Sequence, residues 1–329
     1  IYAGILNRDQ NHLRMNKYDA STGELVRNLF EERNDRYVEP LHELYFFPGD
    51  DSKFIWQSRR DGWNHLYQYD TDGNLLKQIT KGKWEVLDLI GSDPQGSSLF
   101  YESTIESPLE KHLCKTEIKT GKTEKITSGE GVHSIVAPQG MNFFLDVFSG
   151  LQMARAYYLI DSKGTKISTL LEDPDPYRGY LTGEMSIFTI KADDGITDLW
   201  CRLIKPVNFD PSLKYPVFVY VYGGPHAQMI TNSWTGGAGF FLNYMAQQGY
   251  VVFTLDNRGS SNRGFEFESI IHRQLGETEM ADQMAGIRYL KTLGYVDAER
   301  IGVNGWSYGG FMTIQIMIRN RGVFTPACA

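Results

Sequence analysis

The feature that most restricts the fold is a strand–turn–strand unit that recurs four times in the first half of the chain. Each unit joins a stretch of alternating polar and apolar residues to a second strand through a tight turn ending in glycine. Glycine suits such turns because it adopts positive φ without strain. The turn glycines Gly23, Gly73, Gly121 and Gly164 are 50, 48 and 43 residues apart. A period of roughly 40–50 residues is typical of four-stranded propeller blades.

A β-sandwich made of unrelated hairpins would share the local pattern but lack the steady period, so the propeller is favoured. About four blades fit within residues 1–182, which we predict to form the first domain. The sequence alone leaves open whether these blades close as a small ring or belong to a larger one.

From residue 183 the pattern changes to strands that alternate with helices. The predicted elements are a hairpin over 186–205, strands over 215–222, 250–255 and 300–304, and helices over 240–248, 280–293 and 311–319. The strands are apolar on both faces, as buried parallel strands are. This order is typical of a doubly wound α/β sheet, so residues 183–329 are predicted to form a second domain.

The segment Gly305-Trp-Ser307-Tyr-Gly309 lies between the last predicted strand and the last predicted helix. G-x-S-x-G in this setting is the nucleophile turn of α/β-hydrolases, whereas the same five residues can occur by chance on another strand–helix turn. Two earlier buried strands favour the functional interpretation, with Ser307 as the nucleophile. We expect the flanking glycines to be required because a Cβ atom would collide with the neighbouring strand and helix.

An acyl-transfer site also needs donors for the oxyanion that develops on the substrate. The Tyr308 amide, at the start of the helix, is one candidate. The loop that begins at Tyr222-Gly223-Gly224-Pro225 directly follows a buried strand, where hydrolases place the second donor. Either the loop backbone or the Tyr222 hydroxyl could serve; the alternative is a simple turn with a core tyrosine.

A complete triad in this fold continues after the serine with Asp or Glu and then His. The 22 residues that follow Ser307 contain none of these three residue types, and all seven histidines precede it. We therefore expect residues 1–329 by themselves to be inactive. His226 comes too early in the chain to be the base, and we expect it to be a hydrogen-bonding loop residue.

Composition excludes several other classes of function. The net charge of −7 argues against nucleic-acid binding, which depends on Lys and Arg. Cys114, Cys201 and Cys328 are widely spaced, so we predict neither a disulfide framework nor a metal site and expect buried thiols. No apolar run approaches the roughly 20 residues that span a bilayer. No cofactor is predicted.

The hydrolase half resembles the dipeptidyl peptidase IV branch of the prolyl oligopeptidase family. The segments that carry the resemblance are Val221-Tyr222-Gly-Gly-Pro225, Asp256-Asn-Arg-Gly-Ser260, Arg273-Gln-Leu-Gly276, Ala281-Asp-Gln283 and Gly305-Trp-Ser-Tyr-Gly-Gly310. The first half resembles the same family more loosely. The resemblance implies a central fragment of a protein with an eight-bladed propeller and an α/β-hydrolase domain.

The same resemblance implies a serine exopeptidase that removes N-terminal di- or tripeptides after proline. Ser307 would form the acyl-enzyme, Tyr222 and the Tyr308 amide would form the oxyanion hole, and the Tyr308 ring would line the proline pocket. It further implies peptide substrates, a homodimer and a periplasmic or secreted location. The acidic pair that binds the substrate amino group is expected outside this chain, and Glu31-Glu32 are expected in a solvated loop.

The sequence leaves three alternatives open. A carboxylesterase would share the nucleophile turn but would have little use for a propeller. An acylaminoacyl peptidase or oligopeptidase of the same family would cleave different peptides. A non-catalytic propeller protein would use the chain for binding alone.

Overall fold

The computed structural model describes residues 1–329 and divides into two units. The blade unit contains Ile1–Gly129, His133–Val147 and Tyr157–Leu170, and the hydrolase unit contains the remaining residues, chiefly Leu171–Ala329. The predicted domain boundary at residue 182 falls in the connection between strand β15, which ends at Asp173, and strand β16, which begins at Met185.

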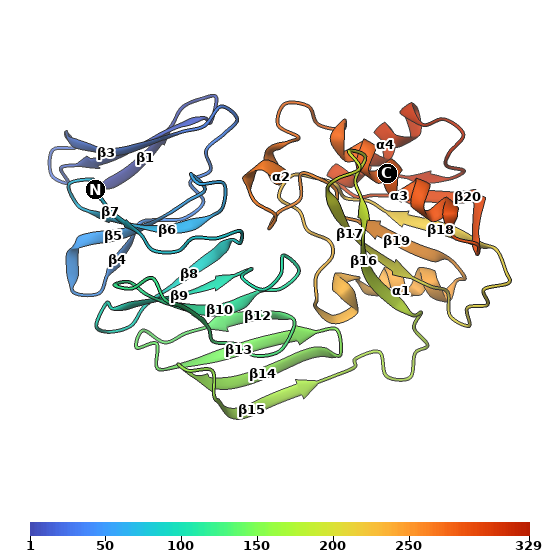
Figure 1. Ribbon diagram of the computed structural model, residues 1–329, viewed down its shortest axis with the longest axis horizontal. Helices are drawn as coiled ribbons and strands as arrows, with labels where there is room; N and C mark the ends of the chain where they lie inside the picture. Colours follow the sequence, from blue (N-terminus) through green and yellow to red (C-terminus); the bar gives the residue numbers. More distant parts are fainter. The chain divides into compact units, whose positions relative to one another are not determined.

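Four small antiparallel sheets follow one another in chain order in the first half of the chain (Figure 1). Their strands are β1 (Tyr2–Leu6), β2 (His12–Tyr18) and β3 (Leu25–Arg33) in the first; β4 (Tyr45–Phe47), β5 (Asp50–Ser58), β6 (His65–Asp70) and β7 (Leu75–Gln78) in the second; β8 (Val86–Ser92), β9 (Ser98–Ser103), β10 (His112–Glu117) and β11 (Thr123–Lys125) in the third; and β12 (Val132–Val136), β13 (Phe143–Gly150), β14 (Met153–Asp161) and β15 (Lys166–Asp173) in the fourth. These are four propeller blades, the first with three strands.

The predicted turn glycines join the last two strands of each blade. Gly23, Gly73, Gly121 and Gly164 all have positive φ, between 74° and 89°. Each glycine amide donates to the carbonyl oxygen of a residue three or four positions earlier, for example Gly73 to Asp70. The glycine repeat therefore marks one structural position in all four blades, as predicted.

Neighbouring blades pack through apolar side chains that both sheets contribute. Leu13 of the first blade lies in one core with Trp56 of the second. Ile55 and Leu99 join the second and third blades, while Phe100 and Phe144 join the third and fourth. A blade buries apolar surface against its neighbours, so the blades stabilise one another by the hydrophobic effect.

The hydrolase unit is built on a six-stranded sheet in the order β16-β17-β19-β18-β20-β21. Its strands are β16 (Met185–Lys191), β17 (Asp198–Ile204), β18 (Tyr215–Tyr220), β19 (Val251–Leu255), β20 (Val296–Asn304) and β21 (Ala327–Cys328). The β16–β17 hairpin is antiparallel, and β19, β18, β20 and β21 are parallel. This is the predicted α/β-hydrolase architecture.

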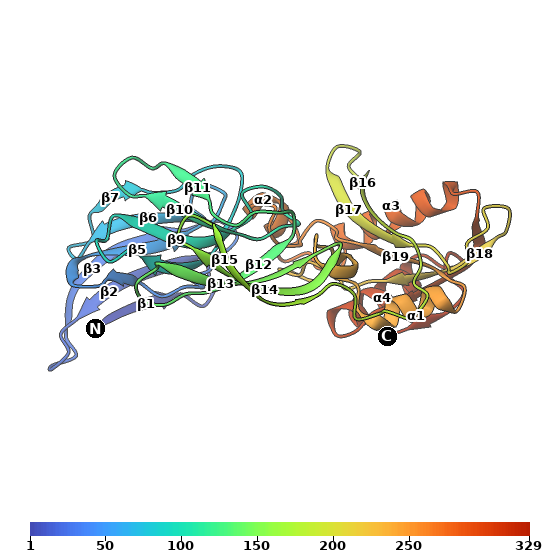
Figure 2. The same cartoon turned by 90° about the horizontal axis from the view of Figure 1, so that it is seen from below.

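Helices cover both faces of this sheet. Alternate residues of β18 point to opposite faces: Val217 and Val219 belong to the core that includes α3 (Thr278–Thr292) and α4 (Tyr308–Arg319), whereas Phe218 packs against the core of α1 (Phe240–Gln247). Figure 2 shows α3 and α1 on opposite sides of the strands. None of the helices combines the length and apolar character needed to cross a bilayer.

Three expectations need correction. Glu31 and Glu32 lie in β3 rather than in a loop, and Glu32 accepts hydrogen bonds from Trp56 Nε1 (2.8 Å) and from Arg60. Cys328, in β21, is exposed rather than buried, whereas Cys114 and Cys201 are buried as expected. The last helix, α4, begins at Tyr308, three residues earlier than predicted, because the turn at Ser307 leads directly into it. Two short elements, α2 (Phe265–Ser269) and a 3-10 helix (Trp234–Gly237), were not predicted.

Candidate active site

Two parallel neighbours, β18 and β20, bring the predicted site residues to one edge of the sheet. Tyr220 of β18 pairs in register with Asn304 of β20. Because both strands end there, Tyr222 and Ser307 leave the sheet at the same edge. The carboxyl ends of parallel strands are where ligand sites form in open α/β sheets.

Ser307 stands at the turn between β20 and α4 with an exposed side chain. Its backbone has φ 60° and ψ −119°, a conformation that non-glycine residues rarely adopt. Such strain costs about 1–3 kcal/mol and persists only where the surroundings enforce it, often at functional sites. The turn therefore presents the hydroxyl outward at the tip of a rigid bend.

The flanking glycines are required for the reason that the sequence suggested. A Cβ atom on Gly305 would lie 2.2 Å from the carbonyl oxygen of Gly309, and one on Gly309 would lie 2.3 Å from the carbonyl oxygen of Val221. The second contact also shows that the nucleophile turn packs directly against the backbone that leads into Tyr222. The turn and the donor loop are thus one packed assembly.

The aromatic rings of Tyr222 and Tyr308 lie close together. Their ring centroids are 6.2 Å apart with an interplanar angle of 39°. Gly224 lies between them, since a Cβ atom there would be 2.7 Å from Tyr222 Cε1 and 3.0 Å from Tyr308 Cγ. As the first residue of α4, Tyr308 also has an amide without an acceptor inside the helix, and this amide is available to an oxyanion.

A buried glutamate holds the far end of the Tyr308 ring. The Tyr308 hydroxyl donates to Glu279 Oε1 at 2.7 Å, and Glu279 is fully buried. Burial, followed by the hydrogen bond and negative charge of Glu279, raises the pKa of Tyr308 above its usual value. Tyr308 is therefore a neutral donor at physiological pH.

A second set of buried polar groups fixes residues 229–236, which follow the loop that begins at Tyr222. Asp256 accepts hydrogen bonds from the amides of Met229 (2.9 Å) and Ile230 (3.0 Å). Arg202 donates to the carbonyl oxygens of Met229 (2.9 Å) and Gly236 (2.6 Å). Burial raises the pKa of Asp256 to about 7 and lowers that of Arg202 to about 10.

Several residues that support this site were not assigned a role by the sequence, namely Glu279, Asn257 and Gln283. Gln283 Nε2 donates to Asn257 Oδ1 at 2.9 Å, and both side chains are buried. A usable signal was present: polar residues 279, 282 and 283 occupy i, i+3, i+4 positions, which are expected to be apolar on a buried helix face.

No hydrogen bond joins a histidine to Ser307, so the contacts of this serine identify no base. His226 is exposed and its Nδ1 lies 2.8 Å from Glu268 Oε1 of α2, in keeping with the expected role as a loop hydrogen-bonding residue. The residues that follow Ser307 contain no Asp, Glu or His.

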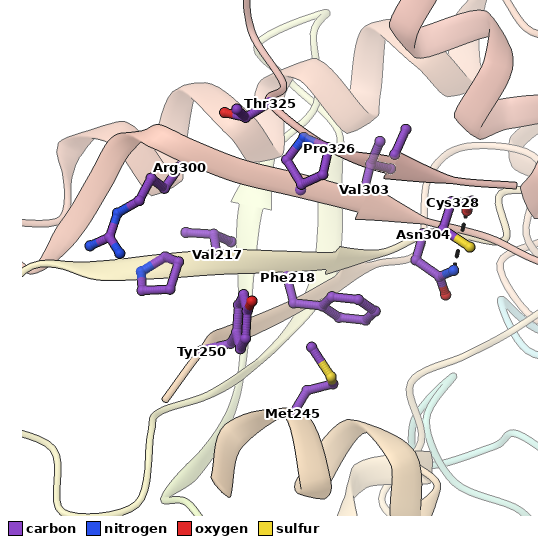
Figure 3. A pocket seen from close by; sticks show the side chains of 13 residues that line it. Val217, Phe218, Met245, Tyr250, Arg300, Val303, Asn304, Thr325, Pro326 and Cys328 are labelled. Atoms are coloured by element: carbon purple, nitrogen blue, oxygen red, sulfur yellow. Dashed lines mark hydrogen bonds between the residues drawn. The ribbon is translucent and has the colours of Figure 1, made fainter. Parts of the chain in front are cut away.

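A cavity of about 430 Å³ elsewhere in the hydrolase unit is separate from these residues (Figure 3). Phe218, Met245 and Tyr250 line it from below the sheet, and Pro326 and Cys328 line it from β21 and the segment before it. None of Ser307, Tyr222 and Tyr308 lines this cavity.

Comparison with known proteins shows similarity to dipeptidyl peptidases along most of the chain. A family model described as the dipeptidyl peptidase IV N-terminal region matches residues 1–155, and the prolyl oligopeptidase family model matches residues 239–329. Mouse dipeptidyl peptidase 8 is 30% identical over 344 residues, which cover 92% of this chain and 38% of that protein. The chain belongs to the dipeptidyl peptidase IV branch of the prolyl oligopeptidase family.

Two solved structures share the fold of this chain. Porphyromonas gingivalis dipeptidyl peptidase 4 matches 99% of this chain and 46% of its own, with 31% identity and a TM-score of 0.91. A Bacteroides ovatus protein, inferred to be a dipeptidyl aminopeptidase IV, matches 99% of this chain and 49% of its own, with 41% identity and a TM-score of 0.94. The chain thus spans less than half the length of these relatives.

Proposed function

We propose that the protein is a serine exopeptidase that removes N-terminal di- or tripeptides after proline through an acyl-enzyme at Ser307. One observation supports this most: an exposed serine, held in a strained turn, shares the edge of the sheet with Tyr222 and Tyr308. The names of the relatives supply the substrate class. The geometry of the three residues supports the following mechanism.

Ser307 Oγ attacks the carbonyl carbon on the carboxyl side of proline, and its proton passes to a base. The carbonyl oxygen becomes an oxyanion, to which the Tyr222 hydroxyl and the Tyr308 amide donate hydrogen bonds. The amine leaves with a proton as the carbon–nitrogen bond breaks, which leaves an ester on Ser307. Water then hydrolyses this ester, and the serine recovers its proton.

The base and its acidic partner are absent from residues 308–329. We therefore assign the activity to a protein as long as the relatives, and we expect negligible hydrolysis by residues 1–329 alone. Robust cleavage of a Gly-Pro substrate by residues 1–329 would contradict this assignment, because no complete triad would account for it.

Kinetics of an active, relative-length protein test the proposal. Ser307→Ala should abolish turnover, and Tyr222→Phe should lower kcat by roughly 100- to 1000-fold, the usual value of one oxyanion donor. Tyr244→Phe is the matched control, since Tyr244 is an exposed tyrosine of α1 and should leave kcat unchanged. Unchanged turnover in Tyr222→Phe would remove Tyr222 from the mechanism, and activity in Ser307→Ala would refute the proposal.

A substrate panel separates the related activities. Xaa-Pro and Xaa-Xaa-Pro substrates distinguish release of dipeptides from release of tripeptides. N-blocked peptides report an acylaminoacyl peptidase or oligopeptidase, and simple esters report a carboxylesterase. Preference for blocked peptides or esters would contradict the exopeptidase assignment.

Two further assignments rest on the family resemblance alone. The protein at the length of its relatives is proposed to be a homodimer, which light scattering tests. It is proposed to act in the periplasm or outside the cell, which fractionation tests.

A further inference from the structure

We propose that Glu279 and Gln283, on one buried face of α3, are positioning residues for the two sides of the oxyanion hole. This inference rests on the proposed function. The residues lie four positions apart, so their side chains project from the same side of the helix. Both are almost completely buried, at 0% and 3% exposure. Each reaches a different part of the site.

Glu279 holds the side that belongs to the nucleophile turn. One carboxylate oxygen accepts from the Tyr308 hydroxyl at 2.7 Å, and the other accepts from the Gly276 amide at 3.0 Å. The carboxylate is thus fixed at both oxygens. Tyr308 is held at its hydroxyl by Glu279 and at its backbone by α4, so both its ring and its amide are given one orientation.

Gln283 holds the side that belongs to Tyr222. Its Nε2 donates to the Leu255 carbonyl oxygen at 3.0 Å and to Asn257 Oδ1 at 2.9 Å. Asn257 Nδ2 in turn donates to the carbonyl oxygen of Gly223 at 3.2 Å. Gly223 directly follows Tyr222 and has a φ of 71°, so this relay fixes the turn from which the Tyr222 ring projects.

The helix itself is held close to the sheet at this point. A Cβ atom on Gly286, one turn after Gln283, would lie 2.9 Å from Phe253 Cε1 of β19. Asp282 accepts from Arg258 Nη2 at 2.7 Å and from its Nε at 2.9 Å. α3 therefore connects the nucleophile turn to the loop that follows Tyr222 through buried hydrogen bonds. Removal of one partner of such a bond is costly, because the other partner stays buried without a hydrogen bond.

The test uses an active, relative-length protein with every rate expressed per titrated active site. Glu279→Met and Gln283→Met keep the side-chain length but remove the hydrogen bonds. We expect kcat to fall roughly 10- to 100-fold in each, with a smaller change in KM, since small misplacement of catalytic groups has effects of this size. Glu279→Gln should restore most of the rate, because its amide can still bond both Tyr308 and Gly276.

The affinity for a tetrahedral ligand distinguishes a positioning role from a merely structural one, because a structural role would leave this affinity unchanged. A peptide boronate that adds to Ser307 should lose affinity in parallel with kcat/KM, and it should lose more affinity than a dipeptide product, which forms no tetrahedral adduct. Ile287→Val, which removes one methylene group from the buried face of α3, is the matched control and should lose stability but not turnover per site. If Gln283→Met fails to fold, Gln283→Glu replaces it, because it sets an oxygen against the Leu255 carbonyl oxygen at unchanged size.

Unchanged kcat per site and unchanged boronate affinity in Glu279→Met and Gln283→Met would overturn the inference. Equal losses in the boronate and product affinities would also overturn it, because they would indicate general damage to the pocket. The proposed function fails separately, through activity in Ser307→Ala.

Discussion

The blades and the hydrolase unit satisfy their buried polar groups in different ways. In the second blade, Thr80 Oγ1 lies 3.0 Å from His65 Nδ1 and accepts from the Leu66 amide at 3.0 Å. The third blade repeats this arrangement 47 residues later with Thr127, and the corresponding distances are both 3.1 Å. Each contact joins a strand to the second residue after the end of the neighbouring strand in the same blade.

In the hydrolase unit the corresponding contacts join segments far apart in the chain. Gln283 bonds Asn257, 26 residues away, and Arg202 bonds the Gly236 carbonyl oxygen, 34 residues away. The threonine contacts repeat within single blades, whereas the contacts around Ser307 place loops that have no regular structure. Substitutions in the two regions should therefore have different consequences.

The largest expected effect is at the nucleophile turn. Gly305→Ala should destabilise the hydrolase unit by about 3 kcal/mol or more, because the new methyl group would lie 2.2 Å from a backbone carbonyl oxygen. Gly294→Ala is the control, since no atom lies within 4 Å of its added methyl group. Urea unfolding followed by hydrogen exchange should show the loss in β18, β20 and α4 and not in the blades. Equal behaviour of the two variants would contradict the packing described for the turn.

A smaller and repeated effect is expected in the blades. Thr80→Val and Thr127→Val each leave a buried leucine amide without its acceptor and should each lower the free energy of unfolding by about 1–3 kcal/mol. The two losses should agree, because the two blades share one geometry, and kcat per active site should not change. Thr169→Val, at an exposed position of β15, is the control. Unequal losses, or a change in kcat, would break the contrast between the regions.

The sequence predicted those features that recur or that depend on local backbone chemistry. The glycine period predicted the blades because each turn requires positive φ at one position, and Gly305 and Gly309 were predicted from the crowding that surrounds them. The nucleophile turn was located because a strand, a serine between glycines and a helix follow one another directly.

What the sequence did not yield depends on contacts between distant segments. The spacing of Glu279 relative to residues 282 and 283 marks a polar helix face, but only the fold places Tyr308 beside Glu279, 29 residues later. Glu32 resembles a solvated carboxylate, although Trp56 and Arg60 of the next blade enclose it. Such pairings arise from tertiary packing, and no pattern in the sequence identifies the partners.

A crystal structure of the active, relative-length protein with a bound Xaa-Pro boronate tests the central claim most directly. We predict a bond from boron to Ser307 Oγ, with one boronate oxygen within hydrogen-bonding distance of both the Tyr222 hydroxyl and the Tyr308 amide. A boronate attached to another residue, or an oxygen turned away from both donors, would contradict the assignment of these three residues.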